Sequence, residues 1–103
     1  MWIREWKCTC PEETTKGFLG YLNETGVKDT QSLDGCCGYK IFIRTLDNES
    51  EITLHTYWQT KEQMKYYAGE NMYHAVLYPE DAKYRITPDH EVKVYEEIAS
   101  QHP

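Results

Sequence analysis

Apolar and polar side chains alternate along the first part of the chain. From Trp2 to Cys10 they repeat with a period of two, which predicts a strand because successive side chains of a strand point to opposite faces. Pro11 ends this strand, and the two glutamates that follow suit the positive N-terminal end of a helix. The apolar stripe of that helix consists of Phe18, Leu19 and Leu22, a spacing typical of one helical face.

A loop and a hairpin are predicted next. Gly26 is expected to cap the end of the first helix, and the polar residues 27–35 indicate a loop. A second strand is expected over about residues 39–44. The turn-forming residues 46–50 join it to a third strand, about residues 51–58, in an antiparallel hairpin.

A capping box marks the start of the second helix. In this spacing of Thr60 and Gln63, each side chain satisfies a backbone N–H that the first turn leaves unpaired. The helix is expected to bury Met64, Tyr67 and Ala68.

Three further elements are predicted towards the C-terminus. Gly69 interrupts the second helix, and helical spacing resumes over residues 70–77 until Pro79 breaks it. A short turn over residues 80–84 and a final strand over residues 90–98 complete the chain.

The predicted order is βαββαβ, in a single α+β domain of residues 1–103. Two helices cover only one face of a four-stranded sheet, yet apolar side chains occupy both phases of the first three strands, as Ile3 and Trp6 illustrate. We therefore expect a homodimer that buries the uncovered face against a second copy. Arg4 and Glu5 point to opposite faces of their strand, and one hypothesis pairs Arg4 with a carboxylate of the partner subunit.

Charge and composition exclude several classes of partner. The chain has 11 basic and 17 acidic residues, a formal charge of −6, which disfavours nucleic acid and anionic membranes. No long apolar stretch is present, and the start of the chain lacks the pattern of a signal peptide. We therefore expect a soluble, cytoplasmic protein.

The four cysteines form two close pairs, Cys8/Cys10 and Cys36/Cys37. Without an export signal they are expected to be reduced thiols. A zinc site usually has Cys-x2-Cys spacing, and this pattern does not match it, so no metal is expected.

Three stretches resemble a known family. Arg4-Glu5-Trp6 on the first strand, Tyr57-Trp58 leading into the Thr60-capped helix, and the run from Ala75 to Asp81 resemble the antibiotic biosynthesis monooxygenase family of the dimeric α+β barrel superfamily. The resemblance implies a ferredoxin-like protomer with a four-stranded antiparallel sheet. It also implies a homodimer whose two sheets form a barrel, and a pocket between sheet and helices in each subunit.

The resemblance further implies a cofactor-independent monooxygenase. Such enzymes act on small electron-rich aromatic molecules such as quinols, because a deprotonated phenol can itself reduce O2 in a dry pocket that supplies a proton acceptor. His55 and His74 are the predicted bases. The predicted substrate-binding residues are Trp6, Trp58, Tyr67 and Tyr78.

Each candidate residue also has a structural interpretation. Trp58 and Tyr67 suit core positions, and Tyr78 suits the break before Pro79. His55 shares a strand phase with polar neighbours and suits an interface or the surface, while His74 suits the edge of a helix.

Three alternative functions stay open. The first is a pocket that binds a small ligand without converting it, as a sensor or accessory subunit. The second is a heme-binding or heme-degrading relative. Such relatives use an Asn on the first strand, where this chain has Trp6, a Trp on the second helix, where it has Tyr67, and an axial His. His74 is the one helical histidine predicted, about one turn too early for that role. The third is a purely structural dimer whose pocket is filled by its own side chains.

Overall fold

Five antiparallel strands form one sheet in residues 1–101, the part of the chain that the computed structural model describes; the last two residues of the predicted domain lie outside it. β1 (Trp2–Pro11) pairs with β3 (Glu49–Trp58), which pairs in turn with β2 (Cys36–Leu46). On its other side β1 pairs with two short strands, β4 (Thr87–Pro88) and β5 (Lys93–Glu96). The order β2-β3-β1-β4 confirms the ferredoxin-like α+β fold, with the last strand divided in two.

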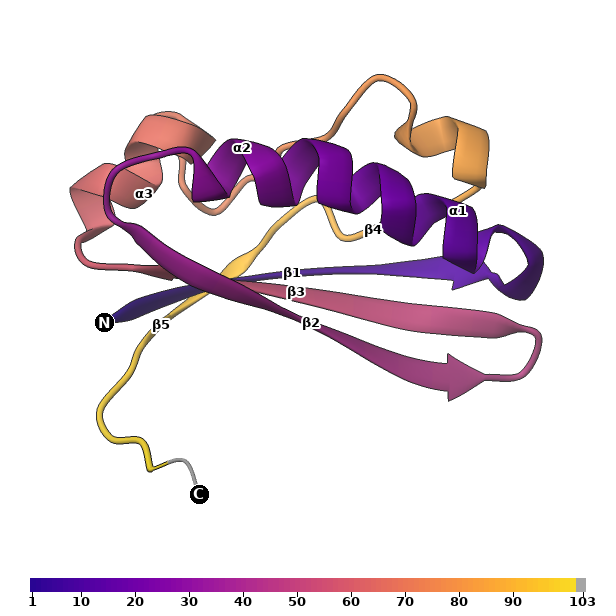
Figure 1. Cartoon of the computed structure of the whole chain (residues 1–103), viewed down its shortest axis with the longest axis horizontal. Coiled ribbons are helices and arrows are strands. Elements are labelled where there is room, and N and C mark those ends of the chain that lie inside the picture. The colour runs from indigo at the N-terminus through magenta and orange to yellow at the C-terminus, as the bar shows by residue number, and fades with distance from the viewer. Residues whose placement is uncertain (102–103) are drawn as a thin grey trace.

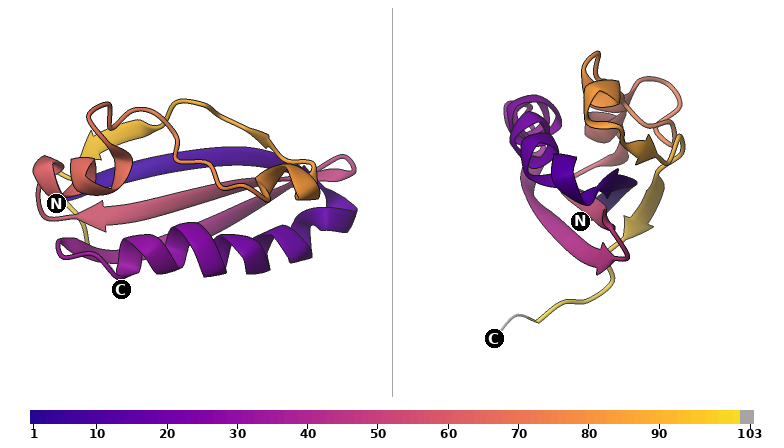
Figure 2. Two further views of the ribbon diagram at one scale, coloured as in Figure 1. Left: turned by 90° about the horizontal axis from the view of Figure 1, so that it is seen from above. Right: turned by 90° about the vertical axis from the view of Figure 1, so that its right-hand side faces the viewer.

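The helices all lie on one face of this sheet (Figures 1 and 2). α1 (Glu12–Leu22) continues without a break through a π-helical segment, η1 (Asn23–Val27), into α2 (Lys28–Gln31). The predictions of a cap at Gly26 and of a loop from residue 27 are therefore wrong. Gly26 is buried, and a Cβ atom there would lie 3.9 Å from the Tyr67 hydroxyl, so this glycine permits close packing and does not end the helix.

α3 (Lys61–Ala68) begins as predicted. The Thr60 Oγ1 atom accepts a hydrogen bond from the Gln63 backbone N–H at 3.2 Å. The Gln63 side chain does not return to the Thr60 backbone; its Oε1 accepts from the Thr60 hydroxyl at 3.0 Å. Gly69 ends the helix with a φ of 90°. This backbone conformation is not helical, and glycine adopts it readily because it has no Cβ atom.

The prediction of further helix over residues 70–77 is wrong. The Val92 N–H donates to the Tyr73 carbonyl at 2.7 Å, and the Ala75 N–H donates to the His90 carbonyl at 2.8 Å. Residues 73–75 and 90–92 therefore pair with each other, which also explains why the final strand, predicted over 90–98, is confined to Lys93–Glu96. The predicted turn at 80–84 is a 3₁₀ helix, η2 (Asp81–Tyr84).

The core lies between the helices and the sheet in two clusters. One is built around Trp6, Phe18, Leu22, Ile52 and Leu54, and the other around Trp58, Met64 and Met72. Since these side chains are buried by α1, η1, α2 and α3, the other sheet face has no helix over it (Figure 2). Within residues 1–101, no helix has the length and apolar character needed to cross a membrane.

We call this second surface the open face of the sheet. The pairing register places the following side chains on it: Ile3, Glu5, Lys7, Lys40, Phe42, Arg44, Glu51, Thr53, His55, Tyr57, Lys93 and Tyr95. At its centre the His55 ring nitrogen Nε2 lies 2.8 Å from a carboxylate oxygen of Glu5, and the Phe42 ring packs edge-on against the His55 ring. His55 therefore has the interface or surface position that its strand phase indicated.

Candidate functional site

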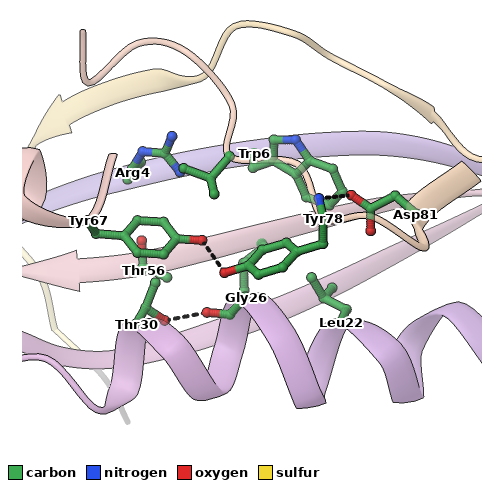
Figure 3. Close-up of a pocket in the computed structure, with 11 residues that line it drawn as sticks. Arg4, Trp6, Leu22, Gly26, Thr30, Thr56, Tyr67, Tyr78 and Asp81 are labelled. Atoms are coloured by element: carbon green, nitrogen blue, oxygen red, sulfur yellow. Dashed lines mark hydrogen bonds between the residues drawn. The ribbon is translucent and has the colours of Figure 1, made fainter. Parts of the chain in front are cut away.

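A small cavity lies between the helix side of the sheet and the irregular segment that follows α3 (Figure 3). Its lining residues come from β1, the α1–η1–α2 helix, β3, α3 and the segment up to η2: Arg4, Trp6, Leu22, Gly26, Thr30, Leu54, Thr56, Tyr67, Val76, Tyr78 and Asp81. The free volume is about 20 Å³, and a water needs at least roughly 10–15 Å³ by this measure. The cavity therefore has room for about one water molecule in this conformation.

Two tyrosines form the wall between this cavity and the outside. The Tyr67 and Tyr78 hydroxyl oxygens are 3.1 Å apart, and the Tyr78 hydroxyl donates to a carboxylate oxygen of Asp29 at 2.7 Å. Because Tyr78 has a single hydroxyl proton, the Tyr67 hydroxyl must donate to Tyr78. Burial raises the pKa of both phenols, so both remain neutral hydrogen-bond donors at neutral pH.

An open groove runs along the outer side of this wall. Its volume is about 410 Å³, and it shares Tyr67, Val76 and Tyr78 with the cavity. The groove and the cavity are thus separated by side chains of residues 67, 76 and 78. Tyr78 and Val76 belong to the irregular segment between α3 and η2, where few regular hydrogen bonds restrain the backbone.

Arg4 brings a buried positive charge to the cavity. Only 6% of its surface is exposed. Its Nη2 donates to the His74 carbonyl at 2.6 Å and its Nε to the Met72 carbonyl at 3.4 Å. The guanidinium carbon lies 5.7 Å from the centre of the Tyr67 ring. Burial lowers the pKa of Arg4 from its very high usual value, but an arginine remains protonated.

Trp6 supplies a second buried donor. Its side chain lines the cavity, its exposed fraction is 6%, and its Nε1 has no hydrogen-bond partner among residues 1–101. A buried N–H without a partner costs free energy relative to its hydrated state. Trp6 is thus held in the core by apolar packing against neighbours such as Phe18, with its polar group unused.

Asp81 is the one carboxyl group among the residues that line the cavity. Its Oδ2 accepts the Tyr78 backbone N–H at 2.8 Å, while Oδ1 accepts no hydrogen bond within the part of the chain described. Burial raises the pKa of Asp81, and the hydrogen bond from Tyr78 opposes that shift. A carboxylate with a raised pKa is a better proton acceptor than an ordinary aspartate.

Three of the residues predicted to bind substrate come together here, namely Trp6, Tyr67 and Tyr78. Trp58 does not line the cavity. It is completely buried behind Tyr67, with which its ring stacks at 6.3 Å, and its Nε1 donates to the Thr56 hydroxyl at 2.9 Å.

The two histidines predicted as bases lie outside the cavity. His55 is on the open face with Glu5. The His74 side chain is exposed, and only its backbone carbonyl reaches the site, through Arg4. Since His74 lies in the extended segment and not on a helix, the premise of a helical axial ligand for heme is also wrong.

Sequence reasoning missed Arg4 and Asp81 as cavity residues. Arg4 has the same strand phase as Trp6, so both point to the covered face, away from any partner that covers the open face. The hypothesis that Arg4 meets a partner's carboxylate does not fit that position. Asp81 was signalled only by its place directly after the Tyr78-Pro79-Glu80 break.

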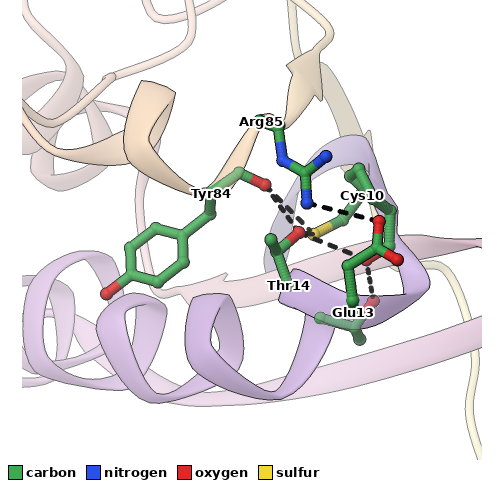
Figure 4. Close-up of polar contacts among 7 residues, drawn as sticks. Cys10, Glu13, Thr14, Tyr84 and Arg85 are labelled. Atoms are coloured by element: carbon green, nitrogen blue, oxygen red, sulfur yellow. Dashed lines mark hydrogen bonds and ion pairs between the residues drawn. The ribbon is translucent and has the colours of Figure 1, made fainter.

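A separate polar cluster ties η2 to the start of α1 (Figure 4). The Thr14 hydroxyl donates to the Tyr84 carbonyl at 2.7 Å, the Cys10 thiol lies 3.1 Å from the same hydroxyl, and Arg85 pairs with Glu13 at 3.2 Å. These contacts hold η2, and hence Asp81, against the helix.

The cysteines and the acidic residues form no metal site in residues 1–101. All four cysteines are free thiols. Burial raises the pKa of Cys8 to about 12, so its thiol is protonated at neutral pH and is a weak nucleophile.

The fold and the site together define a class of protein: a ferredoxin-like α+β domain with a small cavity between its sheet and its helices. A scan against protein-family models matches no family. A search of curated proteins also finds no match.

Solved structures, in contrast, match almost the whole chain. A candidate antibiotic biosynthesis monooxygenase from Bacillus cereus is similar with a TM-score of 0.68 and 14% identity, over 99% of this chain and 97% of the other. A second candidate of that name, from Deinococcus radiodurans, has a TM-score of 0.66 and 17% identity, over 100% and 98% of the two chains. Rv0793 from Mycobacterium tuberculosis has a TM-score of 0.59 and 17% identity, over 99% and 100%. The chain therefore has the fold of the antibiotic biosynthesis monooxygenase family.

Proposed function

We propose that the protein is a cofactor-independent monooxygenase that acts on a small, electron-rich aromatic molecule of the quinol type. The observation that carries the proposal is the one carboxyl group of the cavity, Asp81, whose Oδ1 is free and whose pKa burial raises, in a lining of aromatic and aliphatic side chains. The names of the similar structures support the same reaction class.

The chemistry needs little from the protein. One quinol with a free ring C–H and one O2 give one hydroxyquinone and one water, with the four electrons that reduce O2 supplied by the substrate. Asp81 accepts the phenolic proton, which makes the ring electron-rich enough to reduce O2. Tyr67 and Trp6 orient the ring, and the apolar walls of Leu22 and Leu54 exclude water.

The cavity must open before such a substrate can enter, because its free volume of about 20 Å³ is far smaller than an aromatic ring. Displacement of Tyr78 would join the cavity to the outer groove, since both are bounded by this side chain. The motion would break the hydrogen bonds from Tyr78 to Asp29 and from Tyr67 to Tyr78. Tyr78 therefore acts as the entrance to the site.

Oxygen uptake tests the proposal. Purified protein treated with a chelator is incubated with a panel of quinols and other dihydroxy-aromatic compounds in an oxygen electrode. The Asp81→Asn variant is expected to lower kcat by about 10²- to 10⁴-fold, the usual contribution of a positioned proton acceptor. Asp47→Asn, an exposed aspartate in the hairpin turn, removes the same charge and should keep the activity. Absence of uptake across the panel would contradict the proposal.

A non-catalytic ligand-binding protein is the second candidate, and the buried, unpaired Nε1–H of Trp6 favours it, together with the buried charge of Arg4. In that case a compound from the same panel raises Tm without consuming oxygen.

A further inference from the structure

The cavity holds a positive charge that no carboxylate neutralises. Arg4 forms no ion pair with any acidic side chain of residues 1–101, although it is buried. Its hydrogen bonds go to two backbone carbonyls, those of Met72 and His74. Carbonyl groups satisfy donors, but they do not supply a countercharge, and a buried unpaired charge is costly.

The two acidic groups nearest the cavity contact Tyr78 and not Arg4. Asp29 accepts a hydrogen bond from the Tyr78 hydroxyl at the outer wall, and Asp81 accepts one from the backbone N–H of the same residue. Neither carboxylate lies within the 4.0 Å of an ion pair with Arg4.

Trp6 adds a second, independent sign of a missing acceptor. It lies two residues after Arg4 on β1, on the same face of the sheet, and its buried Nε1–H has no partner within the described chain. Positions two apart on a strand are about 7 Å apart, so one small molecule can span both side chains.

We infer that the cavity binds its aromatic ligand through an anionic oxygen, and that the guanidinium of Arg4 holds this oxygen. Nη1 makes no hydrogen bond within residues 1–101, so Arg4 retains donors for the ligand. The ring of the ligand then lies among Tyr67, Trp6 and Leu54. This inference rests on the cavity of the proposed function and deepens it, because it specifies an aromatic acid or phenolate in place of any neutral aromatic.

Calorimetric titration under nitrogen tests the inference without any turnover. Three probes share one ring: para-nitrobenzoate carries a carboxylate, para-nitrophenolate at pH 8.5 carries a phenolate, and para-nitrobenzamide is neutral. The wild type should bind at least one anion about 10- to 100-fold more tightly than the amide, the usual range for hydrogen bonds to a charged group. Which anion binds distinguishes a carboxylate from a phenolate ligand.

A variant then assigns the effect to Arg4. Arg4→Met should abolish the preference for the anion, while Arg44→Met, which removes an exposed arginine from the open face, should retain it. Circular dichroism and Tm establish that both variants are folded, and Arg4→Lys replaces Arg4→Met if the latter does not fold. Arg4→Lys keeps the charge but loses the planar fork, and should weaken anion binding while retaining some preference.

Two results would overturn the inference. One is equal or absent binding of all three probes by the wild type, which requires no variant. The other is an anion preference that a folded Arg4→Met or Arg4→Lys protein retains in full. Because no oxygen is present, the anion site can be established even if the oxygenase proposal fails. Conversely, oxygen uptake with neutral quinols by a protein that does not prefer the anionic probes would support the oxygenase proposal and contradict the anion site.

Discussion

Asp81 links the chemistry of the site to the stability of the protein. Its carboxyl group is partly withdrawn from water at the cavity wall, and burial raises its pKa in the folded state above that of an unfolded aspartate. The folded state therefore binds this proton more tightly than the unfolded state. By linkage, the contribution of Asp81 to stability is greatest below the unfolded pKa of about 3.9 and is lost as the pH rises through the folded pKa.

The matching prediction is a pH-dependent effect of Asp81→Asn. Asparagine can still accept the Tyr78 N–H, but it carries no charge to desolvate. The variant should therefore gain Tm relative to the wild type as the pH rises from 4 to 7, as measured by scanning calorimetry at several pH values. Asp47→Asn controls for the lost charge. A Tm difference between Asp81→Asn and wild type that is constant with pH, or falls towards pH 7, would contradict the assignment.

Individual residues of the site were predictable where an aromatic side chain coincided with a recognisable element. Trp6 follows from the strand alternation and Tyr67 from the capped helix, and both line the cavity. Arg4 and Asp81 were not predictable as a site, because each owes its role to burial by the segment between α3 and η2. The pattern of that segment is misleading, because the helical spacing of residues 70–77 does not predict the extended path that the chain takes.

Among the elements, the helix from Glu12 to Gln31 is the one whose packing shapes the cavity. Gly26 lies in its π-helical part. A π-helical turn contains one residue more than an α-helical turn, and such turns are often found near functional sites. A Cβ atom at Gly26 would lie 3.5 Å from Leu22 Cδ1 and 3.9 Å from both the Tyr67 hydroxyl and the Tyr78 ring. These are ordinary contact distances, so alanine fits without a clash but occupies space at the floor of the cavity.

Gly26→Ala should therefore stabilise the protein and weaken the site. Replacement of a helical glycine by alanine contributes about 1 kcal/mol, which raises Tm by roughly 4–8 °C in a domain of about this size. Oxygen uptake or probe affinity should fall, because the added methyl group faces Tyr67 and Tyr78.

Gly20→Ala is the matched control for this prediction. It lies in the same helix, and a Cβ atom there meets nothing within 4 Å, so it should give a similar gain in Tm with unchanged binding. Equal binding by Gly26→Ala and Gly20→Ala would show that the floor beside Gly26 does not contact the ligand.

Element prediction from sequence succeeded where the local signals agreed with the tertiary contacts. The Thr60 cap, the hairpin and the first strand are confirmed because their signals are local. Residues 70–77 have helical spacing, but the glycine at position 69 and the pairing of residues 73–75 with 90–92 outweigh it. Propensity alone could not reveal a partner that lies 17 residues further along the chain.

On the scale of the whole molecule, the open face of the sheet remains to be explained. Phe42 is 48% exposed and Tyr95 is 45% exposed, beside Ile3 and Tyr57 of the same face. Several polar groups among them contact one another, since His55 Nε2 lies 2.8 Å from Glu5 and Glu51 contacts both Arg44 at 3.2 Å and Lys7 at 3.9 Å. A second copy that covers this face would bury apolar rings together with charges that already contact one another, and such charges cost less free energy to desolvate than unpaired ones.

We therefore expect a homodimer through the open face, and sedimentation velocity at micromolar concentration measures it. Phe42→Asp places a carboxylate at the middle of β2 on this face and should give a folded monomer, because covering an unpaired charge is costly. Tyr66→Asp is the control, since Tyr66 is 83% exposed on α3, on the opposite side of the sheet, and should leave the dimer intact. A wild type that sediments as a stable monomer would contradict the expectation. The cavity would then have to work with the residues of a single subunit, such as Arg4, Trp6 and Asp81.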